Sequence, residues 1–231
     1  MKTDSVKLSL VDVSLVDGLG NTMPLFYHEG QYYVEARDLA EYRIEVKGHA
    51  SGKLEVLTSV DGMNTLKKEK AHFQLSRGMV ISGRTLYDVK GWRIDDDHTR
   101  PFVFTVLSAE AIATQVTKRT DNLGVIAVAV YREYVEPPQV YMNFRGGSVS
   151  KGSLESSRSF PGMGTGMGDR LDSDHVGHTT FQRASYDPTE MVEIFAMPGW
   201  WLKQQGIIRD VSTSRPHGFA GGTGYDNLNK I

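Results

Sequence analysis

The sequence Leu-Gly-Val-Ile-Ala-Val-Ala-Val-Tyr, at residues 123–131, is the stretch that decides the fold. It is apolar on both faces of an extended chain and rich in β-branched residues, which favours a central buried strand over a helix. Asn122 bounds the run on its amino-terminal side. The small residues Gly124, Ala127 and Ala129 leave room for side chains of neighbouring strands to approach closely. We therefore expect a β-sheet built around this strand.

The residues before this strand form a series of short segments in which apolar and polar residues alternate. The series begins with Val6, Leu8 and Leu10, and Glu29-Gly30 joins two aromatic-rich runs as the turn of a β-hairpin does. Turn residues recur about every 8–12 positions, a spacing typical of an antiparallel sandwich. The pattern predicts a mainly β protein whose body, an antiparallel, jelly-roll-like β-sandwich, spans residues 1–135.

The composition changes after the sandwich. Residues 136–170 are rich in Gly, Ser and Pro and are expected to form a long connector. In residues 171–206 we expect an appended β-hairpin, made of Thr179–Ala184 and Met191–Ala196, followed by a short helix. Residues 207–231 contain several Gly residues and little periodicity, which predicts an extended or disordered C-terminal arm.

Composition and charge exclude several classes of protein. The chain has 231 residues, with 26 Lys+Arg against 28 Asp+Glu, a formal net charge of -2 and no Cys. The lack of Cys excludes disulfide frameworks, thiol catalysis and iron–sulfur ligation. The near-neutral charge argues against a dedicated nucleic-acid-binding protein. No apolar run approaches the roughly 20 residues that span a bilayer, and no export signal is visible, so we expect a soluble protein without a membrane partner.

A Gly-rich motif resembles a phosphate-binding loop at first sight. Residues 161–168 are Pro-Gly-Met-Gly-Thr-Gly-Met-Gly, but neither flank predicts the strand and helix that a dinucleotide-binding loop requires. A flexible or tightly turning connector is favoured instead. Nucleophilic catalysis has no support either, because the chain contains no G-x-S-x-G motif.

Two groups of residues could bind a metal ion. His175 and His178 could act as ligands, although residues three apart on a strand point to opposite faces. Asp95-Asp96-Asp97 could bind calcium, but a solvated turn is favoured because the ligand spacing of an EF-hand is missing. We therefore expect no metal, no cofactor and no catalytic residue.

The pair Trp200-Trp201 concentrates aromatic surface in the expected helix. At adjacent helical positions at least one indole is expected to pack on the sheet, and the pair could also anchor a partner or stack on a sugar. The expected partner-binding residues are Trp200, Trp201, Arg209, Arg215, Phe219 and Tyr225.

Several short motifs carry a family resemblance. They are Tyr32-Tyr33-Val34-Glu35, Leu57–Asn64, Gly91-Trp92-Arg93, Phe102-Val103-Phe104, Asn122–Ala129, Gly164–Gly168 and Phe181–Ala184. In their order the chain resembles a poorly characterised family of bacterial and phage-associated β-sandwich proteins. The resemblance implies a sandwich with a small appended hairpin and helix, and it implies no catalytic residue because the family has no established activity. An added N-terminal strand and the Gly-rich tail depart from the family, and such arms are expected of a subunit that enters an assembly.

We therefore expect a non-enzymatic structural or interaction protein, most concretely a phage virion component: a capsid decoration, minor capsid or tail-associated subunit. Its expected partners are other virion proteins, in a homo-oligomer or as capsid or tail neighbours. Its expected location is the virion, assembled in the host cytoplasm; if it is not a virion component, we expect it in the cytoplasm. Two alternatives stay open: a metal-dependent hydrolase that uses His175, His178 and Asp95–Asp97, and a carbohydrate-binding sandwich that uses Trp200 and Trp201.

Overall fold

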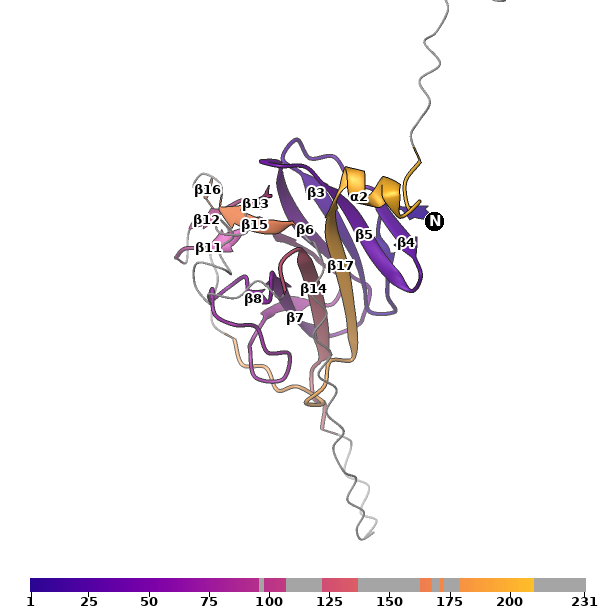
Figure 1. Cartoon of the computed structure of the whole chain (residues 1–231). Helices are drawn as coiled ribbons and strands as arrows, with labels where there is room; N and C mark the ends of the chain where they lie inside the picture. Colours follow the sequence, from indigo (N-terminus) through magenta and orange to yellow (C-terminus); the bar gives the residue numbers. More distant parts are fainter. Residues whose placement is uncertain (96–97, 107–121, 137–162, 168–170, 173–178, 210–231) are drawn as a thin grey trace, which may run out of the picture.

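The computed structural model describes residues 1–95, 98–106, 122–136, 163–167, 171–172 and 179–209. Within these ranges the chain forms two β-sheets that pack face to face, with a third, smaller sheet at one side (Figure 1). The protein is therefore mainly β, and the predicted β-sandwich is confirmed.

The larger sheet, sheet A, has eight strands. Its order is β1 (Lys2–Thr3), β4 (Leu25–His28), β5 (Gln31–Ala36), β17 (Glu190–Pro198), β14 (Val125–Arg132), β7 (Lys53–Val60) and β8 (Met63–Asn64), with β9 (Met79–Ser82) also paired to β7. Neighbouring strands are antiparallel except for β17 and β5, which are parallel.

The second sheet, sheet B, has six strands. Its order is β15 (Gly164–Met167), β13 (Phe102–Thr105), β6 (Glu41–Gly48), β3 (Val11–Asp17) and β2 (Val6–Lys7), with β10 (Leu86–Val89) also paired to β6. The third sheet consists of β11 (Trp92–Arg93), β12 (His98–Arg100) and β16 (Leu171–Asp172).

Alternating side chains from both sheets fill one shared core. Ile44 of β6 meets Val128 and Ile194 of sheet A in this core, and all three side chains are fully buried. Aromatic rings fill the end of the core under β13, where Tyr42 stacks on Phe104 with ring centroids 4.2 Å apart. The sandwich is therefore held together mainly by burial of alternating apolar residues.

The central position predicted for residues 123–131 is confirmed. β14 lies between β17 and β7 and pairs with both along most of its length. Ile126, Val128 and Val130 are buried in the core. Ala129 and Tyr131, which point to the opposite face, are 5% and 1% exposed. Both faces of the strand are therefore largely covered, apart from Val125 and Ala127, which are half-buried on the outer face.

The prediction of a hairpin between Thr179–Ala184 and Met191–Ala196 is wrong. β17 pairs with β14 on one side and with β5 on the other, whereas the described residues 179–184 form no strand. Ile194 and Phe195 point to opposite faces, and both are buried. A strand that is apolar on both faces gains most between two neighbours in a covered sheet, and this gain outweighs the advantage of local pairing. β17 therefore belongs to the sandwich and not to an appended unit.

Part of the expected Gly-rich connector is also a strand. Gly164–Met167 forms β15, which pairs with β13 from Phe102↔Met167 to Thr105↔Gly164 and so extends sheet B. Most of residues 136–170, and residues 210–231 of the expected arm, lie outside the described residues.

The short helix expected after the last strand is confirmed. α2 (Gly199–Gln204) follows Pro198 directly and ends ahead of Gly206, whose φ of 68° is the left-handed conformation that Gly adopts at low cost. The helix lies against β5 and β17, over one end of sheet A (Figure 1). In the part of the chain that the structure describes, no helix is long and apolar enough to cross a membrane.

Replacing Ile194 with Ala should lower the free energy of unfolding by about 2–5 kcal/mol, because it removes buried apolar atoms from the strand that joins β5 to β14. Urea unfolding measures this loss. Leu86→Ala is the control, because Leu86 is 58% exposed on β10. Its effect should stay within about 0.5 kcal/mol. Equal losses in the two variants would contradict the central position of β17.

Candidate interaction surface

The outer face of sheet A, which points away from the core, is organised by the register of its strands. Side chains at paired positions of β5, β17, β14 and β7 form rows across this face. Starting near α2, the rows are Tyr33, Phe195 and Val125; Glu193, Ala127 and Ser59; Met191, Ala129 and Leu57; and finally Tyr131 and Glu55. Other parts of the chain cover the first and the last row, and the two middle rows line a groove.

α2 covers the first row with an aromatic cluster. Tyr33, Phe195 and Leu202 are buried together. The ring centroid of Trp201 lies 5.9 Å from that of Tyr33, so this indole packs on the sheet. Trp200, the residue before it, is 64% exposed. The helix is thus anchored through two of its side chains and presents a third, large aromatic side chain to solvent.

The two tryptophans therefore have different environments. Trp201 packs on the sheet, as expected of at least one of the pair, and its contact with Tyr33 disfavours a sugar site that would use both indoles. Arg209 is exposed beyond α2. The remaining expected partner residues lie outside the described residues: Arg215, Phe219 and Tyr225.

A buried ion pair covers the last row. The guanidinium of Arg183 donates from Nε and from one terminal nitrogen to the two carboxylate oxygens of Glu55, over 2.8 and 2.9 Å. The side chains of Arg183 and Glu55 are 8% and 2% exposed. The guanidinium carbon also lies 3.6 Å from the centroid of the Tyr131 ring, a cation–π contact.

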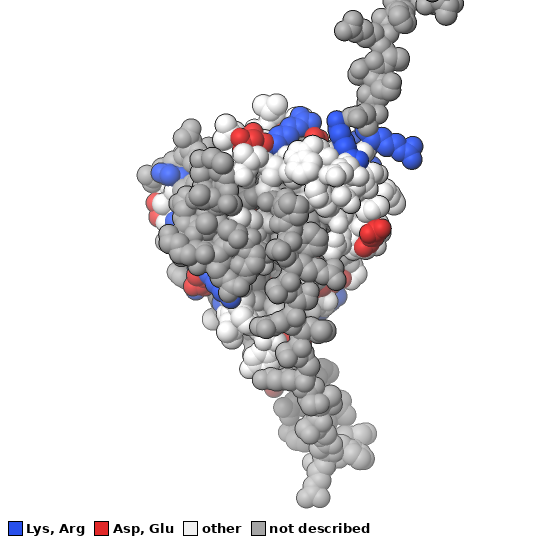
Figure 2. All heavy atoms as spheres, in the orientation of Figure 1, with Lys and Arg blue, Asp and Glu red and all other residues white. Residues whose placement is uncertain are grey.

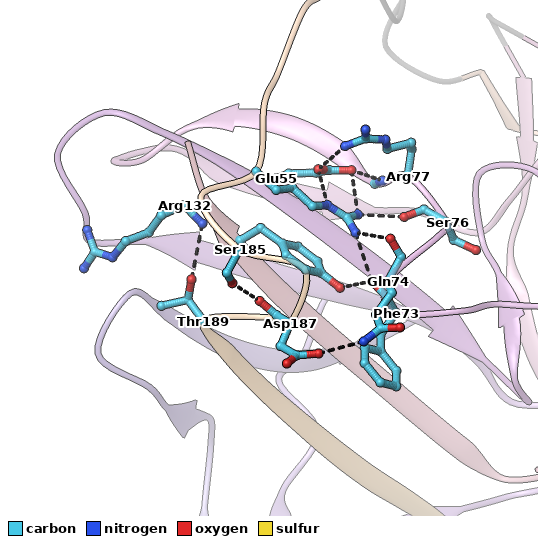
Figure 3. A network of polar contacts seen from close by, with 12 residues as sticks. Glu55, Phe73, Gln74, Ser76, Arg77, Arg132, Ser185, Asp187 and Thr189 are labelled. Atoms are coloured by element: carbon cyan, nitrogen blue, oxygen red, sulfur yellow. Dashed lines mark hydrogen bonds and ion pairs between the residues drawn. The ribbon is translucent and has the colours of Figure 1, made fainter. Parts of the chain in front are cut away.

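The same arginine binds the loop that follows β8 (Figure 3). Its remaining N–H groups donate to the backbone carbonyls of Phe73 (2.9 Å), Gln74 (3.1 Å) and Ser76 (2.6 Å). Glu55 in turn accepts a hydrogen bond from the backbone N–H of Gly78 at 2.7 Å. All five guanidinium N–H groups are used. We call this ion pair and its loop contacts the Glu55–Arg183 clamp, since it fastens two loops to sheet A.

The two middle rows form the floor of a groove of about 190 Å³. The floor is made of small side chains, including Ala127 and Ala129. Phe73 and Met191 line its sides and are 45% and 51% exposed. Glu193, also exposed, lines the groove and forms no ion pair with any residue that the structure describes. The lining of the groove is mixed, because Ser59, Asn122 and the acidic Glu193 contribute polar groups beside the apolar side chains.

Sequence patterns give one signal for this groove. Ala127 and Ala129 are small residues at alternate positions of an otherwise bulky strand, and they predict that something approaches this face closely. Phe181 packs against the cluster that contains Ala129, which is 5% exposed, whereas Ala127 is only half-buried and lines the groove. Met191 and Glu193 are not among the predicted site residues, because their place beside the groove depends on the pairing of β17 with β14.

A second buried carboxylate, Asp61, lies in the turn between β7 and β8. Its oxygens accept the backbone N–H groups of Gly124 at 2.7 Å and Thr165 at 2.5 Å. It thereby joins the turn to the start of β14 and to β15. Burial raises the pKa of the Asp61 carboxyl to about 7. Burial also raises the pKa of the neighbouring Tyr42 well above its ordinary value, and the Tyr42 hydroxyl bonds that of Thr165 at 2.8 Å.

The proposed metal ligands are described only in part. Nδ1 of His98 and Oδ1 of Asp95 are 2.5 Å apart at the β11–β12 turn. The other candidates lie outside the described residues: Asp96, Asp97, His175 and His178. Within the described residues, no group of three His, Cys, Asp or Glu could hold a metal ion. The metal-dependent hydrolase stays a prediction that this geometry does not test.

Replacing Arg183 with Met should lower the free energy of unfolding by about 3–5 kcal/mol, because the Glu55 carboxylate would stay buried without its partner. The loop around residues 73–78 should also be cut faster in limited proteolysis. Arg77→Met is the matched control: Arg77 approaches Glu55 at 3.5 Å but is 59% exposed. Its loss should stay below about 1 kcal/mol. Similar losses in both variants would contradict the clamp.

Asp61 should make the protein less stable as the pH rises from about 4 to about 7. In this range the unfolded carboxyl, whose ordinary pKa is 3.8, ionises while the folded one, with a pKa of about 7, keeps its proton. The folded state then binds more protons than the unfolded state, so stability falls by up to about 1.4 kcal/mol per pH unit.

The measurement compares the original chain with Asp61→Asn in urea unfolding at several pH values between 4 and 7.5. The variant should lose this slope, so the difference in unfolding free energy between the two chains should change steadily with pH. Asp12 and Asp17, whose pKa values are lowered by hydrogen bonds despite some desolvation, are present in both chains and cancel in the difference. A pH-independent difference would contradict the raised pKa.

No protein-family model, no curated protein and no solved structure matches the chain. The family resemblance based on short motifs therefore stays a prediction. A functional proposal for this protein has to rest on the geometry of its own surface.

Proposed function

We propose that the protein is a non-enzymatic interaction protein that docks through the α2 end of the outer face of sheet A. The observation that carries the proposal is the exposed indole of Trp200, 64% accessible, on a helix whose next two residues are anchored in the sheet. Trp is enriched among the residues that dominate binding energy at protein interfaces.

The anchoring of α2 makes Trp200 an efficient contact residue. Trp201 and Leu202 fix the helix backbone on β5 and β17, so a partner does not have to order this segment when it binds. Burying the exposed part of one indole is worth roughly 2–4 kcal/mol before the costs of association. The polar residues Lys203, Gln204 and Gln205 follow, all exposed, and they form the kind of polar rim that surrounds an interface anchor.

Buried and half-buried polar groups support a structural role. Glu190 at the start of β17 accepts the backbone N–H groups of Ser9 and Leu10, both at 2.9 Å, and so ties the segment between β2 and β3 to sheet A. The hydrogen bonds of the Glu55–Arg183 clamp and of Asp61 likewise join separate segments of the chain to each other. These groups strengthen a scaffold and leave recognition to the apolar surface.

The most concrete form of this proposal is a phage virion component: a capsid decoration, minor capsid or tail-associated subunit. Its partners would be other virion proteins, and its location the particle assembled in the host cytoplasm. A rigid β-sandwich with an exposed aromatic anchor is consistent with such a subunit.

The full chain should co-sediment with particles from its native source at a fixed copy number, followed by mass spectrometry of density-gradient fractions. Trp200→Ala should reduce incorporation at least about tenfold, because the interface loses its anchor. Leu86→Ala, which removes an exposed side chain from sheet B, should leave incorporation unchanged.

Recovery of the unaltered chain in the soluble fractions alone would overturn the virion form of the proposal. Equal incorporation of Trp200→Ala and the unaltered chain would overturn the docking surface. Because Trp200 is exposed, its replacement should leave urea unfolding within about 0.5 kcal/mol of the original, which separates lost docking from lost folding.

A further inference from the structure

The exposed indole and the groove belong to the same face of one molecule. We propose that two copies of the chain pair through this face about a two-fold axis, with Trp200 of each copy seated in the groove over Ala127 of the other. This inference rests on the proposed function, since it names a second copy as the partner of the docking surface.

The helix that carries Trp200 and the groove lie next to each other on the outer face of sheet A. Val125 packs against the aromatic cluster under α2 and also lines the groove, so it joins the first row to the middle rows. In a two-fold pair the same patch serves on both copies, and a residue that contacts the groove of the partner does so twice. A protruding side chain and a matching hollow on one face meet this requirement without any other partner.

The size and lining of the groove suit an aromatic ring. Apolar cavities of about 150 Å³ accept benzene in other proteins, and this groove measures about 190 Å³. The small, half-buried side chain of Ala127 keeps the floor low, so a ring can contact the strand at this position. Phe73 and Met191 at the sides offer an aromatic and a thioether contact, both favourable next to an indole.

The charges on this face are complementary. Lys and Arg side chains gather at the end of the molecule where α2 lies, as Figure 2 shows, and Arg209 is exposed just beyond the helix. Glu193 lines the groove. Among the residues that the structure describes, neither Arg209 nor Glu193 has an ion-pair partner. In the proposed pair we place Arg209 of one copy near Glu193 of the other, where the opposite charges would favour this orientation.

The first test is sedimentation equilibrium of the full chain at concentrations up to about 100 µM, where a weak dimer is populated. The unaltered chain should form a dimer. Trp200→Ala and Ala127→Phe, which fills the groove while leaving the indole in place, should each raise the dimer dissociation constant at least about tenfold. Leu86→Ala should leave it unchanged. A monomeric unaltered chain, or a dimer that Trp200→Ala does not weaken, would overturn the proposal.

A charge exchange tests the orientation with exposed residues that folding does not need. Glu193→Arg and Arg209→Glu should each weaken the dimer, and the double variant should recover most of the lost affinity. Failure of the double variant to recover would overturn the two-fold arrangement. The particle experiment separates the two proposals. A monomer that still co-sediments with particles overturns self-pairing and keeps the proposed function. A dimer found in the soluble fractions alone overturns the virion form of the proposed function and keeps self-pairing.

Discussion

The position of β17 is the constraint on which the rest of the structure depends. This strand is antiparallel to β14 and parallel to β5, so it joins the N-terminal hairpin of sheet A to the central strand that decides the fold. Its inward residues, including Ile194, complete the core. Its outward residues contribute to three of the rows on the other face. Without β17, β5 and β14 would each be an open edge with apolar residues on both faces.

The apolar residues on the outer face of sheet A can either be covered by other parts of the chain, which adds stability, or stay open to bind a partner. α2 covers one end, and the Glu55–Arg183 clamp with its loops covers the other. Both covers add stability, since they bury large side chains that would otherwise face water. Between the two covers, Ala127 and Ser59 are small and Glu193 is charged, so leaving this part of the face open costs little burial energy. A surface can therefore stay available for a partner without weakening the sandwich.

The sequence predicts the sandwich and the central strand because both depend on local patterns. The alternation in residues 1–135 and the doubly apolar run at 123–131 are physical requirements of a two-sheet core, visible residue by residue. The helix with its closing Gly206 is equally local. Local patterns do not predict which of the two tryptophans packs on the sheet, because this depends on how α2 packs against Tyr33.

Long-range pairing explains what sequence patterns miss. Glu55 is a carboxylate in an apolar strand, which signals a buried partner, but that partner is 128 residues away in a segment without regular structure. The parallel pairing of β17 with β5 is equally hard to predict from the sequence, because nothing in either strand specifies a neighbour so distant in the chain. The groove follows from both, since its sides come from the clamp loop and from β17.

The parallel pairing of β17 also has a consequence for the order of events during biosynthesis. Sheet A cannot close until the ribosome has released the chain beyond Pro198, at about 5–20 residues per second. Until then β5 and β14 each have one edge with unpaired backbone groups and expose apolar side chains. Such edges favour aggregation. Contacts this distant in the chain also make folding slow. At high expression, the first 190 residues should therefore need a chaperone until the last strand, β17, has been synthesised.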